Sequence, residues 1–209
     1  MFESDPARSV ETAFLPASGP KSDFMQAYVP LVAPTSIWEE MRTQNGGDTL
    51  ALLAEQQPVL LIFLRHFGCS FCREAIADIS RLRQPIEAKG VRIVFVHMAP
   101  KRETAERFFR KYNLFPIDHI SDPEKKFYYA FGLGRGTPAQ LFGLMNWIRG
   151  FQAGVLEGHG FAYQGEDIGD GFQMPGVFML QNKTIKHAFI HQHAWDRPDY
   201  EAIVDCCEL

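Results

Sequence analysis

The chain has few cysteines, no strong excess of either charge and no long apolar run. Its 209 residues include four cysteines. The formal net charge of -4 argues against a nucleic-acid surface or a polybasic membrane patch. No apolar stretch reaches the length of a bilayer span. We therefore expect neither nucleic-acid nor membrane partners.

The N-terminal stretch lacks the charged region followed by an apolar region that is typical of a secretory signal peptide. It reads MFESDPARSVETAFLPASGP. We therefore expect a cytoplasmic protein, in which thiols are kept reduced. In that setting two close pairs, Cys69 with Cys72 and Cys206 with Cys207, indicate thiol chemistry or metal binding rather than structural disulfides.

The order of apolar patterns predicts one layered α/β domain. Continuous apolar runs at 59–64 and 91–97 predict strands buried on both faces. Helical spacing follows each run, over 72–88 and 102–112. A short strand at 117–120 and a helix opening at Asp122-Pro123 complete a β-α-β-α-β-α order.

The second half of the chain interrupts and then closes this order. A glycine-rich insertion at about 132–172 holds a predicted helix, 138–149. Three roles are open for it: it covers the site, it joins two copies of the chain in a homodimer, or it covers one face of the sheet. Strands at 177–180 and 185–190 flank a predicted hairpin turn. A closing helix is predicted over 199–206. We take 1–48 as an N-terminal arm and 49–209 as the domain.

The two cysteines of RHFGCSFCR stand where the first buried strand hands over to a helix. Backbone N–H groups at a helix N-terminus favour a thiolate, which is the reactive form of cysteine. We predict that Cys69 is an exposed attacking thiol and that Cys72, which lies deeper, resolves the intermediate. Arg65 and His66 add positive charge and are predicted substrate contacts, and Phe67 provides apolar surface beside the cysteines.

A structural zinc site is the alternative reading of this motif. Zinc takes four ligands, and Cys206 and Cys207 are adjacent, so that their side chains diverge. His187, His191 and His193 are the remaining candidate ligands. The strand–CxxC–helix context favours redox chemistry. We expect neither a metal nor another cofactor.

Four segments carry a family resemblance, the last of which, HAWDRPDYEAIV, resembles the family's ending. VLLIFLRHFGCSFCREAIADI resembles the active-site segment of the peroxiredoxin-like 2 group, and ISDPEKKFYYAFGLGRG and GDGFQMPGVFMLQNKTIKHAFIH are similar to later segments, in the same order. The resemblance spans about 49–204. It implies a thioredoxin-like three-layer α/β sandwich, with the insertion before a cis-proline. Met174-Pro175 falls at that place, so we expect a cis peptide bond there and both residues beside the dithiol, in contact with substrate.

One departure from the family bears on activity. True peroxiredoxins carry a Pro-x-x-x-Thr/Ser-x-x-Cys segment, and neither cysteine lies in that frame: Ile62 and His66 precede Cys69. The leading expectation is therefore a thiol-dependent oxidoreductase that reduces a disulfide or hydroperoxide. The alternatives are a redox-sensing or scaffold module without turnover, and a peroxiredoxin-type peroxidase. The expected partners are a thiol reductant, such as thioredoxin or glutathione, and a small-molecule or protein disulfide or peroxide. Members of the resembled group include peroxide and prostaglandin endoperoxide reductases.

Overall fold

The computed structural model describes residues 35–142 and 169–206 of the chain. Within them lies a five-stranded sheet with the order β3-β2-β1-β4-β5. The first three strands, β1 (Val59–Phe63), β2 (Arg92–His97) and β3 (Asp118–Ser121), are parallel. The last two, β4 (Gly176–Gln181) and β5 (Thr184–Ile190), form an antiparallel hairpin, and β4 also pairs antiparallel with β1. The α/β thioredoxin-like sheet predicted from the sequence is confirmed.

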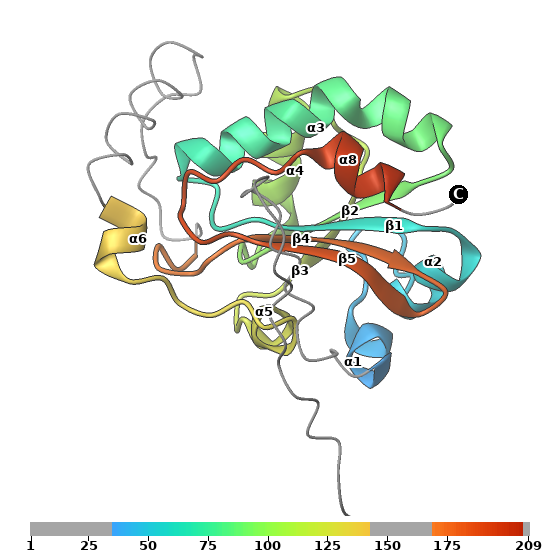
Figure 1. The fold of residues 1–209 in the computed structure, drawn as a ribbon, viewed down its shortest axis with the longest axis horizontal. Coiled ribbons are helices and arrows are strands. Elements are labelled where there is room, and N and C mark those ends of the chain that lie inside the picture. Colours follow the sequence, from blue (N-terminus) through green and yellow to red (C-terminus); the bar gives the residue numbers. More distant parts are fainter. Residues whose placement is uncertain (1–34, 143–168, 207–209) are drawn as a thin grey trace, which may run out of the picture.

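Helices cover both faces of this sheet, which makes the predicted three layers (Figure 1). One face packs against α3 (Ser70–Ala88), α4 (Arg102–Lys111) and α8 (Tyr200–Asp205). The other packs against α1 (Thr35–Glu40), α2 (Leu50–Gln56) and α5 (Lys126–Ala130). A short helix, α6 (Pro138–Phe142), stands at one end of the sheet.

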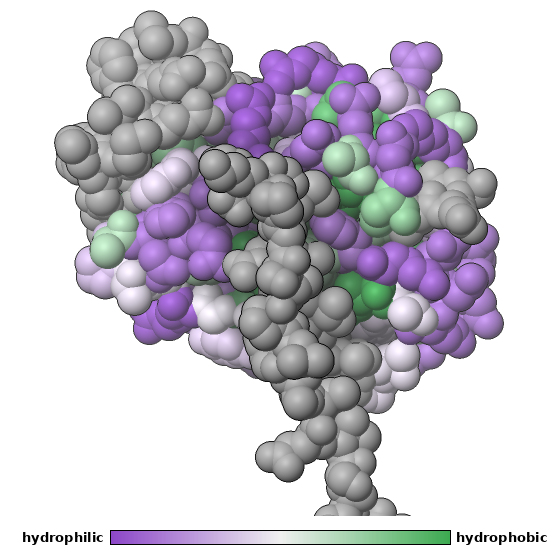
Figure 2. Space-filling model, in the orientation of Figure 1, coloured by the Kyte–Doolittle hydropathy of each residue, from purple (hydrophilic) through white to green (hydrophobic). Residues whose placement is uncertain are grey.

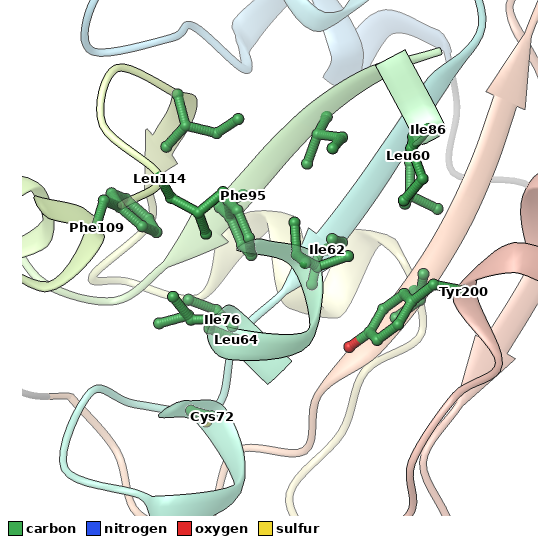
Figure 3. Close-up of a cluster of buried hydrophobic side chains, with 14 of the residues drawn as sticks. Leu60, Ile62, Leu64, Cys72, Ile76, Ile86, Phe95, Phe109, Leu114 and Tyr200 are labelled. Atoms are coloured by element: carbon green, nitrogen blue, oxygen red, sulfur yellow. The ribbon is translucent and has the colours of Figure 1, made fainter. Parts of the chain in front are cut away.

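The central strand explains why the first apolar run is continuous. Alternate residues of β1 point to opposite faces, so Leu60 and Ile62 enter one apolar cluster while Leu61 and Phe63 enter the other. Both faces are thus buried, and no polar position interrupts the strand. Figure 3 shows the first cluster, with Cys72 at its edge.

Side-chain caps and a tight turn fix the ends of several elements. The Thr49 hydroxyl accepts from the Leu52 N–H at the start of α2, and Asp199 caps α8 in the same way. At the hairpin, Asn182 and Lys183 both adopt positive φ, 51° and 56°, as a two-residue turn of this handedness requires. These local signals set the register of β4 against β5.

The division into an arm, 1–48, and a domain, 49–209, stays a prediction. Within the described end of the arm, Trp38 and Met41 are buried against the sheet. Residues 1–34 lie outside the described part, as do 143–168, which hold most of the predicted 138–149 helix and of the insertion. The roles expected for the insertion therefore stay predictions.

The described surface on the face seen in Figure 2 is mostly hydrophilic, with scattered apolar spots. Among the described helices, none combines the length and the hydropathy needed to cross a bilayer.

Candidate active site

The cysteines occupy the junction between β1 and α3, as predicted. Cys69 is the N-cap of α3, and its N–H donates to the His66 carbonyl at 3.0 Å. Cys72 lies in the first turn of the helix and faces the sheet, so both thiols approach the C-terminal end of β1. Both thiols are free.

The two sulfur atoms lie in different electrostatic surroundings. The Cys72 thiol hydrogen-bonds to Cys69, and the charges of Arg65 and His66 add to this; together they hold the pKa of Cys69 well below its usual value, although burial opposes them. Arg65 Nη1 donates to Cys69 Sγ at 3.3 Å. Burial and then the contact with Cys69 raise the pKa of Cys72 well above its usual value. Of the two thiols, Cys69 is therefore the more acidic and Cys72 holds its proton more firmly.

Backbone donors surround the Cys72 sulfur. The N–H groups of Arg65 and His66 point at Sγ from 3.2 and 3.4 Å. Such donors stabilise negative charge on sulfur whenever the thiolate forms. These contacts arise because the chain turns directly after β1, and a sequence motif does not reveal them.

The prediction that Cys69 is exposed is wrong. Its exposed fraction is 6%, against 4% for Cys72, so burial does not distinguish the two thiols. The reason is the Arg65 side chain, which is itself buried and joins Cys69 Sγ to the carbonyl of Gly171. The segment that carries Gly171 is in turn held by Asp170, which pairs with Lys125 Nζ at 2.7 Å.

The other predicted contact residues are distributed around the dithiol. His66 is partly buried, and burial lowers its pKa. Phe67 is 1% exposed and stacks on Phe108 with ring centroids 4.7 Å apart, so it packs the core and offers substrate no surface in this conformation. Met174 is buried with Leu141 and Ala194.

The expected cis-proline is a second error. Among the described residues the cis peptide bond joins Phe115 and Pro116, and the bond before Pro175 is trans. Hydrogen bonds fix the backbone of Met174 on both sides. Its N–H donates to the Gly134 carbonyl at 3.1 Å, and its carbonyl accepts from the Gln173 side-chain amide at 3.2 Å. With the chain held in this way the ordinary preference for trans prevails. Pro175 nevertheless lies beside the dithiol.

A small cavity joins the dithiol to residues that sequence reasoning missed. Its volume is about 30 Å³, and Arg65, both cysteines and Pro175 line one part of it. The same cavity is also lined by Glu74, Asp78, His191, Arg197 and Tyr200. Figure 3 shows the Tyr200 hydroxyl oxygen on the side of its ring that faces Cys72.

Three of the lining residues form an ion cluster, in which Arg197 pairs with two carboxylates of α3. Arg197 Nε lies 2.8 Å from Asp78 Oδ2, and its Nη1 lies 2.9 Å from Glu74 Oε1. Both carboxylates are buried. The available signal was their spacing of four residues, which places them on one face of a helix. Their partner follows more than a hundred positions later, so its identity did not follow from the pattern.

Arg73, the residue after Cys72, binds the loop that precedes the helix. Its guanidinium donates to the Phe67 and Gly68 carbonyls at 3.2 and 3.0 Å. It therefore braces the loop that carries Cys69.

The zinc alternative receives no support from the described residues. Among them no three His, Cys, Asp or Glu side chains gather as metal ligands. His193 pairs with Asp196, Nδ1 to Oδ1 at 3.6 Å, and His191 lines the cavity. Cys206 is exposed and bonds to the Ile203 carbonyl at 2.9 Å, and Cys207 lies outside the described part.

Sequence relatives place the chain among antioxidant enzymes. The sequence model of the AhpC/TSA antioxidant enzyme family matches residues 78–194, a range that begins after both cysteines of the dithiol. Prostamide/prostaglandin F synthase of Danio rerio is 30% identical over 174 residues, which cover 78% of this chain and 82% of the relative. The enzyme of the same name from Salmo salar is 36% identical over 94 residues, 44% of this chain and 46% of its own length.

Solved structures show the same fold. Peroxiredoxin Q of Xanthomonas campestris, in a cysteine-to-serine mutant, superposes with a TM-score of 0.58 at 14% identity and covers 87% of this chain and 96% of its own. Peroxidoxin BcpB of Mycobacterium tuberculosis has a TM-score of 0.54 at 15% identity, with 79% and 88% covered. The chain therefore belongs to the AhpC/TSA antioxidant enzyme family, to its peroxiredoxin-like 2 group, and has the thioredoxin-like fold of peroxiredoxins.

Proposed function

We propose that the chain is a thiol–disulfide oxidoreductase in which Cys69 attacks and Cys72 resolves. The observation that carries the proposal is the contact of Arg65 Nη1 with Cys69 Sγ at 3.3 Å. A guanidinium is always charged, so it stabilises a thiolate at this sulfur. The thiolate is the nucleophile in disulfide exchange, and the Cys72 thiol stands beside it to complete the reaction.

The cycle has two steps on a disulfide substrate. The Cys69 thiolate attacks one substrate sulfur, forms a mixed disulfide and releases the other substrate half as a thiolate. Cys72 then attacks Cys69 Sγ, the Cys69–Cys72 disulfide forms and the second half leaves; the Cys72 proton ends on that half as a thiol. A thiol reductant, for which we propose thioredoxin or glutathione, returns the pair to the dithiol.

Disulfides are favoured over peroxides as substrates because the peroxide-binding Thr or Ser is missing before Cys69, where His66 stands. A second candidate follows from the relatives, which are named prostamide/prostaglandin F synthases. In this reaction the Cys69 thiolate attacks one oxygen of the endoperoxide: the O–O bond breaks, that oxygen bonds to Cys69 Sγ as a sulfenate ester, and the other oxygen leaves as an alkoxide and takes a proton. Cys72 then attacks Cys69 Sγ, the Cys69–Cys72 disulfide forms, and the first oxygen leaves with the Cys72 proton as the second hydroxyl of the product. A prostaglandin endoperoxide is therefore the second substrate to be tried.

The test compares turnover of insulin disulfides and of a prostaglandin endoperoxide, each with reduced glutathione and with a thioredoxin system. Cys69→Ser should abolish turnover. Cys72→Ser should retain the first attack and accumulate a mixed disulfide, which mass spectrometry detects. Cys206→Ser is the matched control and should retain activity. If the Cys69–Cys72 disulfide forms but neither substrate is turned over with either reductant, the proposal is wrong and a redox-sensing module is favoured.

A further inference from the structure

A tyrosine on the opposite face of the sheet from α3 reaches the end of β1. Tyr128 belongs to α5 and is fully buried. Its hydroxyl lies 2.5 Å from the Leu64 carbonyl oxygen and 3.2 Å from that of Val96. A hydroxyl has one hydrogen to donate, and the nearer acceptor is Leu64. The Leu64 N–H is fixed as well, because it donates to the Val96 carbonyl at 2.9 Å.

The Leu64 carbonyl belongs to the same peptide unit as the Arg65 N–H. A peptide unit is planar, and in the trans form its C=O and N–H point in opposite directions. Holding the carbonyl on the α5 side therefore aims the N–H toward the α3 side. There it meets Cys72 Sγ at 3.2 Å. We propose that Tyr128 is a positioning residue for the dithiol, which sets the direction of the backbone donor that stabilises the Cys72 thiolate.

The helix that carries Tyr128 is anchored firmly enough for this role. The Asp122 carboxylate accepts from the N–H groups of Lys126, Phe127 and Tyr128 at 3.0, 2.7 and 3.1 Å. The Asp122 N–H donates to the His97 carbonyl, at the end of β2, at 2.7 Å. Asp122 thus holds α5 at the C-terminal ends of the parallel strands, where the dithiol also lies.

The surroundings of Tyr128 favour the protonated, donating form of its hydroxyl. Burial raises the pKa of Tyr128 well above its usual value, and the charges of Cys72 and Asp122 act in the same direction. A phenol in these surroundings keeps its proton while negative charge forms on the neighbouring sulfur.

The inference rests on the proposed function and concerns its second step. In that step the Cys72 thiol loses its proton, its sulfur bonds to Cys69 Sγ, the bond from Cys69 to the substrate sulfur breaks, and the released half gains the proton. Negative charge develops on Cys72 Sγ before the new bond is complete. The Arg65 N–H stabilises that charge only while it points at the sulfur. The first step forms no charge on Cys72 and does not need this donor.

The experiment separates the two steps in one trace. A symmetrical aromatic disulfide releases one coloured thiolate when Cys69 attacks and a second when Cys72 resolves. The full chain carries Cys206→Ser and Cys207→Ser, so the dithiol supplies the signal. Tyr128→Phe should leave the first burst within about twofold and slow the second about tenfold, as expected for a misdirected hydrogen bond to a charged group.

Two matched controls distinguish positioning from packing. Tyr129→Phe removes an exposed hydroxyl from the next position of α5 and should leave both bursts unchanged. Phe131→Leu loosens the aromatic cluster around Phe63, 5.0 Å away between ring centroids, but keeps the Tyr128 hydroxyl. If Phe131→Leu slows the second burst as much as Tyr128→Phe, or if Tyr128→Phe resolves at the unsubstituted rate, the positioning role is wrong. Absence of a second burst in the unsubstituted dithiol contradicts the proposed function itself.

A second measurement does not depend on whether the variant folds. In the reduced, unsubstituted chain the Arg65 amide lies beyond the last residue of β1 but is hydrogen-bonded to sulfur. Its hydrogen exchange should be as slow as that of the strand interior. Rapid exchange at Arg65 would show that the donor is not held, and would overturn the inference.

Discussion

Arg65 Nη1 lies 3.3 Å from Cys69 Sγ, and the second nitrogen of the same guanidinium binds the Gly171 carbonyl. The Arg65 side chain therefore both stabilises negative charge on the Cys69 sulfur and covers that sulfur. After the hydrogen bond from the Cys72 thiol, the charge of Arg65 is the next influence that lowers the pKa of the nearly inaccessible Cys69.

The first prediction concerns this guanidinium. Arg65→Gln should raise the pKa of Cys69, because the cation that stabilises the thiolate is lost. The midpoint of the pH–rate profile for alkylation of Cys69 by iodoacetamide, which reports ionisation rather than access, should therefore move up by about one pH unit, the effect of one hydrogen bond to a charged group. Arg92→Gln is the control, since Arg92 pairs with Asp118, Nε to Oδ2 at 2.6 Å, at the opposite end of β2. An equal shift of the midpoint in both variants would show a general effect of charge.

The second prediction concerns a buried histidine pair. His97 Nε2 and His119 Nδ1 lie 2.9 Å apart, and both residues are fully buried. Burial lowers the pKa of His97 to about 3 and that of His119 to about 4, from 6.5. The unfolded chain therefore binds more protons than the folded chain as the pH falls below 6.5, and stability is lost in that direction.

Protonation of one histidine of the pair on unfolding should lower the free energy of unfolding by about 2 kcal/mol at about pH 5. Urea unfolding at about pH 7 and about pH 5 measures it. His97→Gln should make the pH dependence of the free energy of unfolding shallower. A pH dependence that survives His97→Gln undiminished would point to other groups.

The third prediction concerns the Arg197 ion cluster. Arg197→Met leaves Glu74 and Asp78 as neighbouring buried carboxylates without this partner. Removing one member of a buried pair costs several kcal/mol, but the arginine is 41% exposed, so we expect a loss of about 2 kcal/mol in urea unfolding. Arg81→Met removes an exposed arginine from the same Asp78 and should cost less than about 1 kcal/mol. Equal costs would mean that burial of the cluster contributes little.

The fourth prediction concerns the covering segment. Gly169 has φ of 98°, and a Cβ there would lie 2.6 Å from Met98 Cβ. Gly169→Ala should therefore shift the segment that binds Arg65 and speed the alkylation of Cys69. Gly47→Ala carries a similar positive φ, 77°, but a Cβ would meet nothing within 4 Å. It should destabilise the chain without changing Cys69. If both glycine variants leave alkylation unchanged, Gly171 is not part of the cover.

Much of the fold follows from local patterns. The run at 59–64 predicts a central strand because only a strand buried on both faces has no polar position. Thr49, Asp199 and the Asn182-Lys183 turn specify ends and register through their own backbone chemistry. Cys69 at a strand–helix junction predicts a thiolate for the same local reason.

The errors share a different origin. The exposure of Cys69 depends on Arg65 and on a segment a hundred residues away, and the trans bond before Pro175 depends on Gly134 and Gln173. Neither contact leaves a periodic signal. The same holds for Arg197, whose carboxylate partners lie on a helix far earlier in the chain.

By itself, then, the sequence determined the order of the elements, the strand–CxxC–helix junction and the hairpin, because each is set by neighbours along the chain. The tertiary structure alone decided which residues meet at the dithiol: Arg65 on Cys69, the carboxylates in the cavity, and Tyr128 beneath Leu64. The physical reason is that the hydrogen bonds and the burial at the C-terminal end of β1 involve elements from both faces of the sheet. These elements are far apart in the sequence, so the residue spacing within any one segment does not predict that they meet.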